Sequence, residues 1–316
     1  MPDLLTLLQH ATVEATPKGA SQMAEDRDFF STALPSRSHV FNTAFGTSDS
    51  LVSSVRSTVA NGFNPVPHIA ARRFRSVAHL NRTLSQLRAV CGDSLWDTVL
   101  VLGGERDEDE EEASAAAALP DAMAVLKTGL LQVYGIKHIL VAGHPEGIMG
   151  MSPSSCSGSN AGAAETAAVL FAALQKKCDY TRAHGLSFGI VTQLCLSSTA
   201  LCSWLADLRS IEGLEGVPVH IGVAGPARIE TVERFADTLC GVRVPQPHEN
   251  GSLLVPLSPP DSKDLDCVAM LSDIAERCPS DAIQSIHIYA FGGLRRTCRW
   301  LHEQRGRMGI SPQCKL

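Results

Sequence analysis

The sequence predicts an α/β protein: a single (β/α)₈ barrel of the TIM type, with long insertions in the loops after strands 4, 5 and 7. Short apolar or β-branched runs recur eight times, and a polar, glycine or proline break and a segment of helical period usually follow. Such alternation is typical of a parallel sheet covered by helices. The first run continues as Glu14-Ala15-Thr16-Pro17, which lacks the glycine-rich fingerprint of a dinucleotide-binding open sheet. These observations together favour a closed barrel.

The expected elements alternate along the chain. The strands are expected at 11–15, 40–43, 65–70, 96–102, 138–142, 188–192, 219–223 and 286–290. The helices between them include 48–60, 76–90, 122–134, 163–184, 199–209, 228–240 and 265–277. Near-continuous apolar strands of this length are expected to be buried on both faces.

Three segments interrupt the alternation. Residues 107–118 join an acidic run to an alanine run, 150–162 are rich in serine and glycine, and 246–262 are rich in proline. Segments of this composition bury too little apolar surface to offset the entropy of ordering, so we expect mobile lids or solvated loops. None of them is a linker between domains, which predicts one domain over 1–316.

Composition excludes some partners. Hydrophobic residues make up 44% of the chain and charged residues 19%, and no apolar run approaches the roughly 18 residues of a membrane span. The net charge of −6 comes without a basic stripe interleaved with aromatics, so a nucleic-acid surface is not expected. The ten cysteines form no C-x-x-C pair and no zinc spacing, which indicates reduced thiols and predicts no metal site.

The two ends of the sequence bear on localisation. Met1-Pro2-Asp3 has neither a secretory signal nor an organelle presequence, which predicts a cytoplasmic protein. The chain finishes in Cys314-Lys315-Leu316, close to the Ser-Lys-Leu type of peroxisomal address. A peroxisome-type organelle is therefore the alternative, and a frayed tail is the simpler interpretation.

The strand ends carry the candidate site, because chemistry in this fold lies at the carboxyl ends of the strands. Polar residues or glycines stand at most of these ends: Glu14, Thr43, His68, Gly104, Glu105, His144, Glu146, Gln193 and Tyr289. A carboxylate flanked by apolar residues, as Glu14 is, is costly to bury unless it is paired or functional. Gln193 can offer both a donor and an acceptor to a heterocycle. His68 and His144 could equally be satisfied core histidines, and Tyr289 could simply cap the core.

Six motifs in order resemble the methylenetetrahydrofolate reductase family, flavoproteins built on this barrel. They span nearly the whole chain: VEATPK from Val13, PHIAAR from Pro67, VLGGE from Val101, VAGHPEG from Val141, VTQL from Val191 and IHIYAF from Ile286. In VAGHPEG, His144 stands where the family has a flavin-stacking tyrosine. The family's aspartate after the fourth strand corresponds either to Glu105 or, after a slip, to Asp107.

The resemblance implies FAD as cofactor and a folate-type substrate, with 5,10-methylenetetrahydrofolate reduced to 5-methyltetrahydrofolate and NADH or NADPH as electron donor. Glu14 would be the general acid, and Gln193 and Tyr289 would contact the pterin. The residues implied at the cofactor are Thr43, His68, Gly104, Glu105, His144, Glu146 and Lys177. Hydride chemistry would belong to the flavin, and the protein would supply position and electrostatics.

Two other interpretations stay open. The altered flavin contacts and unusual insertions are compatible with a barrel that has lost catalysis and serves as a structural or interaction subunit of a larger assembly. For partners, both a homo-oligomer and an assembly partner stay open. A retained flavin with another pterin or one-carbon substrate is the third.

Overall fold

A computed structural model describes residues 4–92, 96–104, 119–148, 160–245, 249–257, 262–278 and 283–310. Its eight strands form a closed barrel in chain order, and the strand pairs given residue by residue are parallel. The strands are β1 (Thr12–Ala15), β2 (His39–Asn42), β3 (Asn64–Ala70), β4 (Thr98–Leu102), β5 (His138–Gly143), β6 (Ser187–Thr192), β7 (Val219–Ala224) and β8 (Ser285–Tyr289). The predicted fold class is confirmed, and each strand lies within two residues of its expected range.

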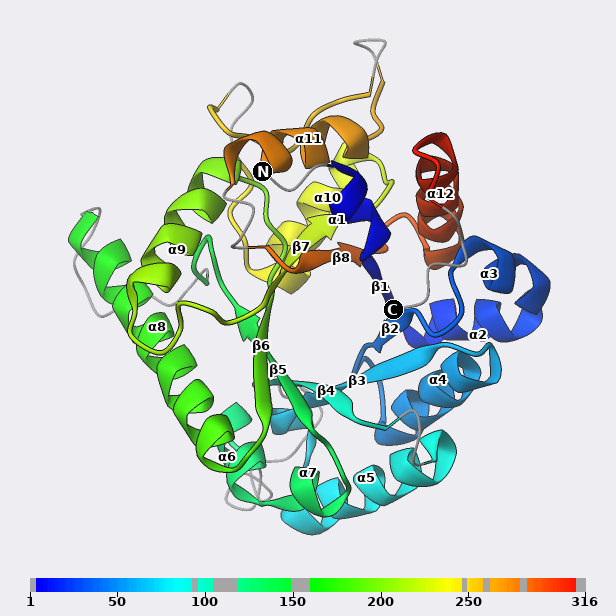
Figure 1. The fold of residues 1–316 in the computed structure, drawn as a ribbon, viewed down its shortest axis with the longest axis vertical. Helices are drawn as coiled ribbons and strands as arrows, with labels where there is room; N and C mark the ends of the chain where they lie inside the picture. The colour runs from blue at the N-terminus through cyan, green and yellow to red at the C-terminus, as the bar shows by residue number, and fades with distance from the viewer. Residues whose placement is uncertain are drawn as a thin grey trace. The chain divides into compact units, whose positions relative to one another are not determined.

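Helices stand between the strands (Figure 1). They are α1 (Leu4–Gln9), α2 (Pro17–Glu25), α3 (Arg27–Ala33), α4 (Ser48–Ala60), α5 (Val77–Cys91), α6 (Ala122–Lys127), α7 (Leu130–Val133), α8 (Asn160–Ala183), α9 (Ser198–Ser210), α10 (Ile229–Phe235), α11 (Cys267–Arg277) and α12 (Leu294–Arg307), with a 3₁₀ turn at Ala71–Arg73 and a π-helical turn at Ala236–Cys240. None of the helices in the described ranges combines the length and apolarity that a membrane crossing requires.

Contacts between residues group the chain into two compact units, and each is described separately. The first spans 14–142 and 181–189. In it, β2 pairs with β3 in the register His39 to Asn64, and β3 pairs with β4 in the register His68 to Leu100. Helices α2, α4 and α5 pack in sequence along these strands (Figure 1).

Capping explains where the main helices of this unit begin. The hydroxyls of Thr16, Thr47 and Ser76 accept hydrogen bonds from the backbone at the starts of α2, α4 and α5. The sequence predicted one helix over 122–134, and this was wrong: Gly129 adopts a left-handed φ of 69° and separates α6 from α7. Glycine tolerates that conformation, whereas a continuing helix cannot contain it.

The second unit spans 1–13, 143–180 and 190–311. Its strand β8 pairs with β1 through Thr12 and His287, and with β7 over five residues. Arg305 of α12 is only 5% exposed. Its guanidinium donates to the carbonyls of Leu8 at 2.9 Å and Gln9 at 3.2 Å, and so ties α12 to the C-terminal end of α1.

The structure describes different parts of the three predicted loops. Residues 107–118 lie outside the described residues, as do 150–159, while 160–162 belong to α8 and not to a loop. The described part of 246–262 is not a solvated excursion: Leu253 is fully buried, and its N–H donates to the carbonyl of Leu196 at 2.8 Å. One apolar anchor of this kind offsets part of the ordering entropy of a proline-rich segment.

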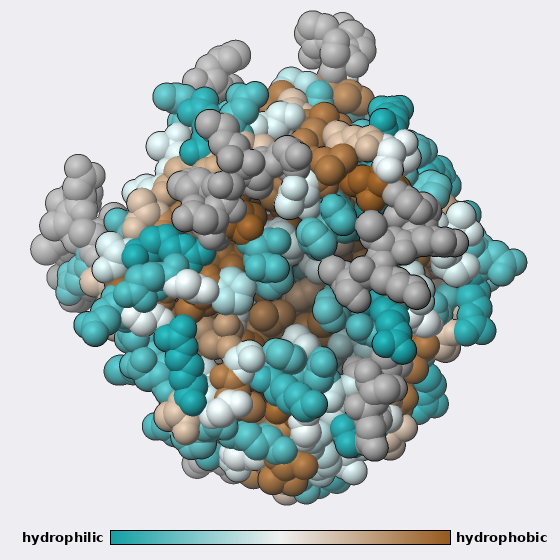
Figure 2. Space-filling view, viewed as in Figure 1, coloured by the Kyte–Doolittle hydropathy of each residue, from teal (hydrophilic) through white to brown (hydrophobic). Residues whose placement is uncertain are grey.

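Large hydrophobic side chains are exposed only singly in the described chain. They are Leu5, Phe45, Val77, Val133, Val169, Leu239 and Leu257, each in a different element or loop. On the face shown in Figure 2, hydrophilic residues dominate the outer parts and hydrophobic colour shows in smaller areas between them. Single exposed apolar residues of this kind are normal for a protein surface.

Candidate functional site

Glu14 and His68 form the central pair of the first unit. Glu14 is the third residue of β1 and His68 the fifth of β3, and the Oε2 atom of Glu14 lies 3.9 Å from Nε2 of His68. The two side chains are 14% and 11% exposed, and the ring of Phe41 meets the imidazole edge-on. A carboxylate and an imidazole at this distance form an ion pair when the histidine is protonated. The arrangement can therefore hold a proton close to Glu14.

Thr43 follows β2 and is almost completely buried, at 2% exposure. Its N–H donates to the carbonyl of Ala15 at 3.1 Å, which fixes the backbone beside the end of β1. Its hydroxyl Oγ1 has no hydrogen-bond partner among the residues that the structure describes. Buried polar atoms are normally satisfied, so this hydroxyl is available to a bound group.

Gly104 follows β4 and has a structural reason to be glycine. Its φ is 70°, and a Cβ there would stand 2.7 Å from the Cβ of Ala70. Its carbonyl accepts a hydrogen bond from the guanidinium of Arg72 at 3.0 Å, and the same side chain donates to Pro120. Glu105 and Asp107 lie outside the described residues, so the choice between them stays open.

His144 follows β5 in the second unit. The preceding Gly143 has no room for a side chain, because a Cβ would meet Ile190 at 2.6 Å and Trp204 at 3.1 Å. Burial, and to a smaller extent the nearby charge of Lys177, lowers the pKa of His144 to about 4. The imidazole is therefore neutral near pH 7. Its buried Nδ1 atom has no hydrogen-bond partner within the described part of the chain.

Lys177 approaches this imidazole from α8. The sequence placed both residues at the cofactor, and the structure brings them close enough for their charges to interact. An uncharged imidazole beside an ammonium group can accept a hydrogen bond or meet an aromatic ring without adding positive charge.

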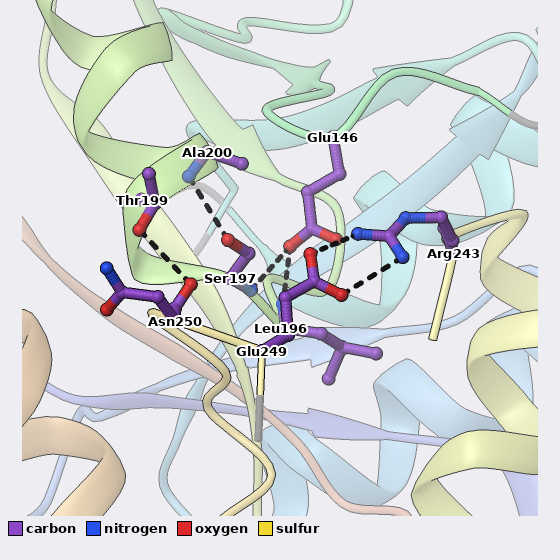
Figure 3. A network of polar contacts seen from close by, with 8 residues as sticks. All are labelled: Glu146, Leu196, Ser197, Thr199, Ala200, Arg243, Glu249 and Asn250. Carbon is purple, nitrogen blue, oxygen red and sulfur yellow. Dashed lines mark hydrogen bonds and ion pairs between the residues drawn. The ribbon is translucent and has the colours of Figure 1, made fainter. Parts of the chain in front are cut away.

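Glu146 has partners inside the protein (Figure 3). Its Oε1 atom accepts hydrogen bonds from the N–H groups of Leu196 at 2.5 Å and Ser197 at 2.8 Å. Burial raises the pKa of this carboxyl, while the two backbone donors and the more distant Arg243 lower it. The hydroxyl of Ser197 in turn accepts from Ala200 and caps α9. The predicted cofactor contact thus has an evident structural role in holding the loop between β6 and α9.

The same close-up also shows an ion pair. Both nitrogens at the end of Arg243 donate to the carboxylate of Glu249, at 3.1 and 2.5 Å. Nearby, the hydroxyl of Thr199 donates to the carbonyl of Asn250 at 3.5 Å. The ion pair joins Glu249 to the chain just before the proline-rich segment, and the Thr199 contact holds Asn250 against the start of α9.

Gln193 and Tyr289 lie at the ends of β6 and β8. The Oε1 atom of Gln193 accepts a hydrogen bond from the N–H of Leu194 at 3.0 Å. Tyr289 donates its hydroxyl to the carbonyl of Thr192 at 3.0 Å. Gly222 leaves room for this ring, since a Cβ there would stand 2.7 Å from it and 2.5 Å from that carbonyl. The Gln193 oxygen is thus engaged locally, which the sequence did not indicate.

Several residues with polar roles were not predicted. Arg73, Arg75 and Arg82 line a cavity that also includes His68, and the run Arg72-Arg73-Phe74-Arg75 was the signal that could have found them.

Among the described residues, no group of three histidine, cysteine, aspartate or glutamate side chains is arranged to hold a metal ion.

The fold and the polar strand ends define the chain as a (β/α)₈ barrel protein with a candidate site at its strand ends.

No family model matches the sequence. A solved structure of 3-keto-D-glucoside 4-epimerase from E. coli matches with 13% identity and a TM-score of 0.43, covering 83% of this chain and 97% of that one. The 3-dehydroquinate dehydratase of Aquifex aeolicus VF5 matches with 10% identity, a TM-score of 0.35 and coverage of 77% and 92%. The D-psicose 3-epimerase of Clostridium cellulolyticum H10 matches with 6% identity, a TM-score of 0.37 and coverage of 96% and 99%. Similarities this low carry no argument about activity.

Proposed function

We propose that the protein is a flavin-dependent oxidoreductase of one-carbon metabolism, which reduces 5,10-methylenetetrahydrofolate to 5-methyltetrahydrofolate or acts on a related pterin. One observation carries the proposal. Thr43 and His144, both assigned to FAD by the resemblance, each keep a buried polar atom without a hydrogen-bond partner in the described chain. Unsatisfied buried groups are uncommon in native proteins, and a polar ligand is one way to satisfy them.

These residues fit the chemistry of a flavin. The Thr43 hydroxyl can donate or accept, and the neutral His144 can do so through Nδ1, as the edges of an isoalloxazine ring require. Lys177, beside His144, supplies positive charge for a phosphate. FAD would supply the hydride, from NADH or NADPH, and the protein would supply orientation and proton positions.

Glu14 is the candidate general acid, because opening a methylene bridge needs a proton delivered to a substrate nitrogen. Its side chain is largely buried, and His68 stands 3.9 Å away. A protonated His68 could return a proton to Glu14 between turnovers. Gln193 and Tyr289 are the proposed pterin contacts. For Gln193, a substrate would have to displace its bond to Leu194 or use the amide nitrogen.

The visible absorption spectrum of the purified protein is the first test. We expect bound flavin, or flavin uptake when FAD is added. A colourless protein that binds no FAD by fluorescence titration would contradict the proposal.

A variant pair sharpens this test. Thr43→Val removes the unpartnered hydroxyl at nearly constant volume, and we expect FAD affinity to fall about tenfold. Thr83→Val is the matched control, because Thr83 is also buried but its hydroxyl donates to the carbonyl of His79 within α5. Equal FAD affinity in the wild type and Thr43→Val would remove Thr43 from the cofactor site.

A second candidate is a barrel that has lost catalysis and acts as an interaction subunit. One observation favours it: the carboxylate of Glu146 and the amide oxygen of Gln193 are both occupied by backbone donors of the protein itself. Affinity purification of the full chain tests it. A stable partner with no flavin supports this candidate, whereas a flavin-bearing homo-oligomer without partners contradicts it.

A further inference from the structure

A cavity of about 330 Å³ lies in the first unit, between the segments that follow β2 and β3. Its lining is strongly basic. Arg73, Arg75 and Arg82 contribute three guanidinium groups, and Asp49 is the only carboxylate among the described lining residues. The volume is at the lower end of the range of roughly 300 to 1,000 Å³ for small-molecule sites.

Two helices begin at this cavity. Thr47 and Ser48 at the start of α4 line it, as do Ser76 and His79 at the start of α5. The Oγ atom of Ser48 lies 2.9 Å from Nε2 of His79, so the two helix starts are bonded to each other. The positive ends of both helix dipoles therefore add to the charge of the arginines.

One arginine is held in place by the loop before α4. The guanidinium of Arg73 donates to the carbonyl of Gly46 at 3.1 Å, and both residues line the cavity. Anchoring of this kind reduces the entropy lost when a planar guanidinium binds an oxyanion.

We propose that this cavity binds the phosphate group of a phosphorylated small molecule. Guanidinium groups and hydroxyls, together with two helix starts, are the donors that phosphate oxygens require. The inference does not rest on the flavin proposal, because it requires no redox chemistry. A dicarboxylate shares part of this chemistry, so the test must separate the two anions.

Isothermal titration of the full chain with pyrophosphate, inorganic phosphate and glutarate is the experiment. We expect pyrophosphate to bind more tightly than glutarate, and its affinity to fall as salt is raised. In Arg73→Gln/Arg75→Gln the affinity for pyrophosphate should fall at least about tenfold. Arg56→Gln is the matched control, because Arg56 is exposed on α4 and does not line the cavity.

Arg82→Gln serves as a second variant if the double variant does not fold, since Arg82 is exposed. Failure of both phosphate probes to bind the wild type would overturn the proposal. So would an equal loss of pyrophosphate affinity in Arg56→Gln, or a glutarate affinity that matches that of pyrophosphate.

Two cysteines of the second unit lie close together. Cys202 lies on α9 and Cys278 directly follows α11, and their Sγ atoms are 2.8 Å apart. Both are free thiols; Cys202 is partly exposed, and Cys278 is 1% exposed. A disulfide needs a sulfur separation of about 2.05 Å, so only a small displacement is required.

We infer that Cys202 and Cys278 form a reversible disulfide when the protein meets a peroxide. The Cys202 thiol loses its proton, and the thiolate attacks one oxygen of hydrogen peroxide. This breaks the O–O bond and gives a sulfenic acid and hydroxide, which takes up the released proton to form water. The Cys278 sulfur then attacks the sulfenic sulfur and expels a second water. The two sulfurs lose two electrons, the peroxide gains them, and a thiol reductant reverses the change. Cys202 is the more exposed of the two thiols, so peroxide reaches its sulfur first, and burial raises the pKa of the Cys278 thiol.

Peptide mass spectrometry under non-reducing conditions tests this. After hydrogen peroxide, we expect a cross-linked peptide that contains both residues and lacks two hydrogen atoms, and its loss after dithiothreitol. Cys202→Ser should abolish the cross-link, whereas Cys91→Ser, at a buried thiol of the other unit, should not. Equal alkylation of Cys202 and Cys278 before and after peroxide would overturn the inference, as would a cross-link to another cysteine.

Discussion

Nε2 of His68 lies 3.9 Å from the Oε2 atom of Glu14, and the two largely buried side chains project from strands β3 and β1. A carboxylate in such a position is costly to bury unless an opposite charge or a proton accompanies it. The imidazole can supply either, because a histidine side chain can carry a proton and with it a positive charge. The pair therefore suits a step in which a proton is delivered and later replaced.

Glu14→Gln should keep the shape of this site but remove the proton. If Glu14 is the general acid, turnover of 5,10-methylenetetrahydrofolate should fall by about 10² to 10⁴ while FAD binding stays unchanged. Glu25→Gln, at an exposed position at the end of α2, is the control. Steady-state kinetics and a flavin titration measure the two effects separately. Unchanged turnover in Glu14→Gln would exclude Glu14 as the acid.

The fold could be predicted because each strand leaves a local signature. The eight apolar runs are contiguous in the sequence, and parallel pairing follows from their alternation with helices. Helix α12 was not predicted, because a buried Arg305 and a charged outer face obscure the repeat formed by Leu294, Cys298 and Leu301. The break between α6 and α7 depends on the conformation of one glycine, Gly129, which composition does not reveal.

The candidate site could be predicted only in part. Strand order places Glu14, Thr43 and His68 at strand ends, which is a consequence of the fold. The distance between Glu14 and His68 depends on register and rotamers, and neither is readable locally. The bonds from Glu146 to residues some 50 positions later are tertiary, as is the contact between Cys202 and Cys278. No spacing rule in a sequence reports such pairs.

The lowered pKa of His144 predicts a pH dependence of stability. Because its pKa is about 4 when folded and near 6.5 when unfolded, the unfolded chain binds the extra proton between those values. This contribution is therefore complete above pH 6.5 and is lost as the pH falls towards 4, by roughly 3 kcal/mol in all. Urea unfolding at pH 7 and pH 5 should show a larger loss for the wild type than for His144→Asn. Equal losses would contradict the prediction.

Lys177 should also lower the pKa of His144. Its positive charge disfavours protonation of His144, so Lys177→Met should raise the imidazole pKa. An NMR titration of the imidazole C–H resonances measures this directly, and Lys176→Met on the exposed face of α8 is the control. An unchanged His144 pKa in Lys177→Met would mean that burial alone lowers it.

Loss of the carboxylate of Glu146 should loosen the loop between β6 and α9. Glu146→Ala leaves the N–H groups of Leu196 and Ser197 without their acceptor, whereas Glu146→Gln keeps an amide oxygen for them. Hydrogen exchange read by mass spectrometry should show faster exchange of residues 194–198 in the alanine variant and nearly wild-type exchange in the glutamine variant. Protection that persists in Glu146→Ala would show that the loop is held by other contacts.

Arg305 offers a test of how the second unit holds its first segment. Its guanidinium donates to the carbonyls of Leu8, Gln9 and Ala11, at 2.9, 3.2 and 3.3 Å, and burial lowers its pKa to about 10. Arg305→Met fills similar space but leaves those carbonyls unsatisfied, so the free energy of unfolding should fall by roughly 2 to 4 kcal/mol. Arg307→Met, at an exposed position of the same helix, should change it by less than about 0.5 kcal/mol. Urea denaturation of both variants at pH 7 measures the difference. Equal stabilities would mean that water or neighbouring groups satisfy the carbonyls as well as the arginine does.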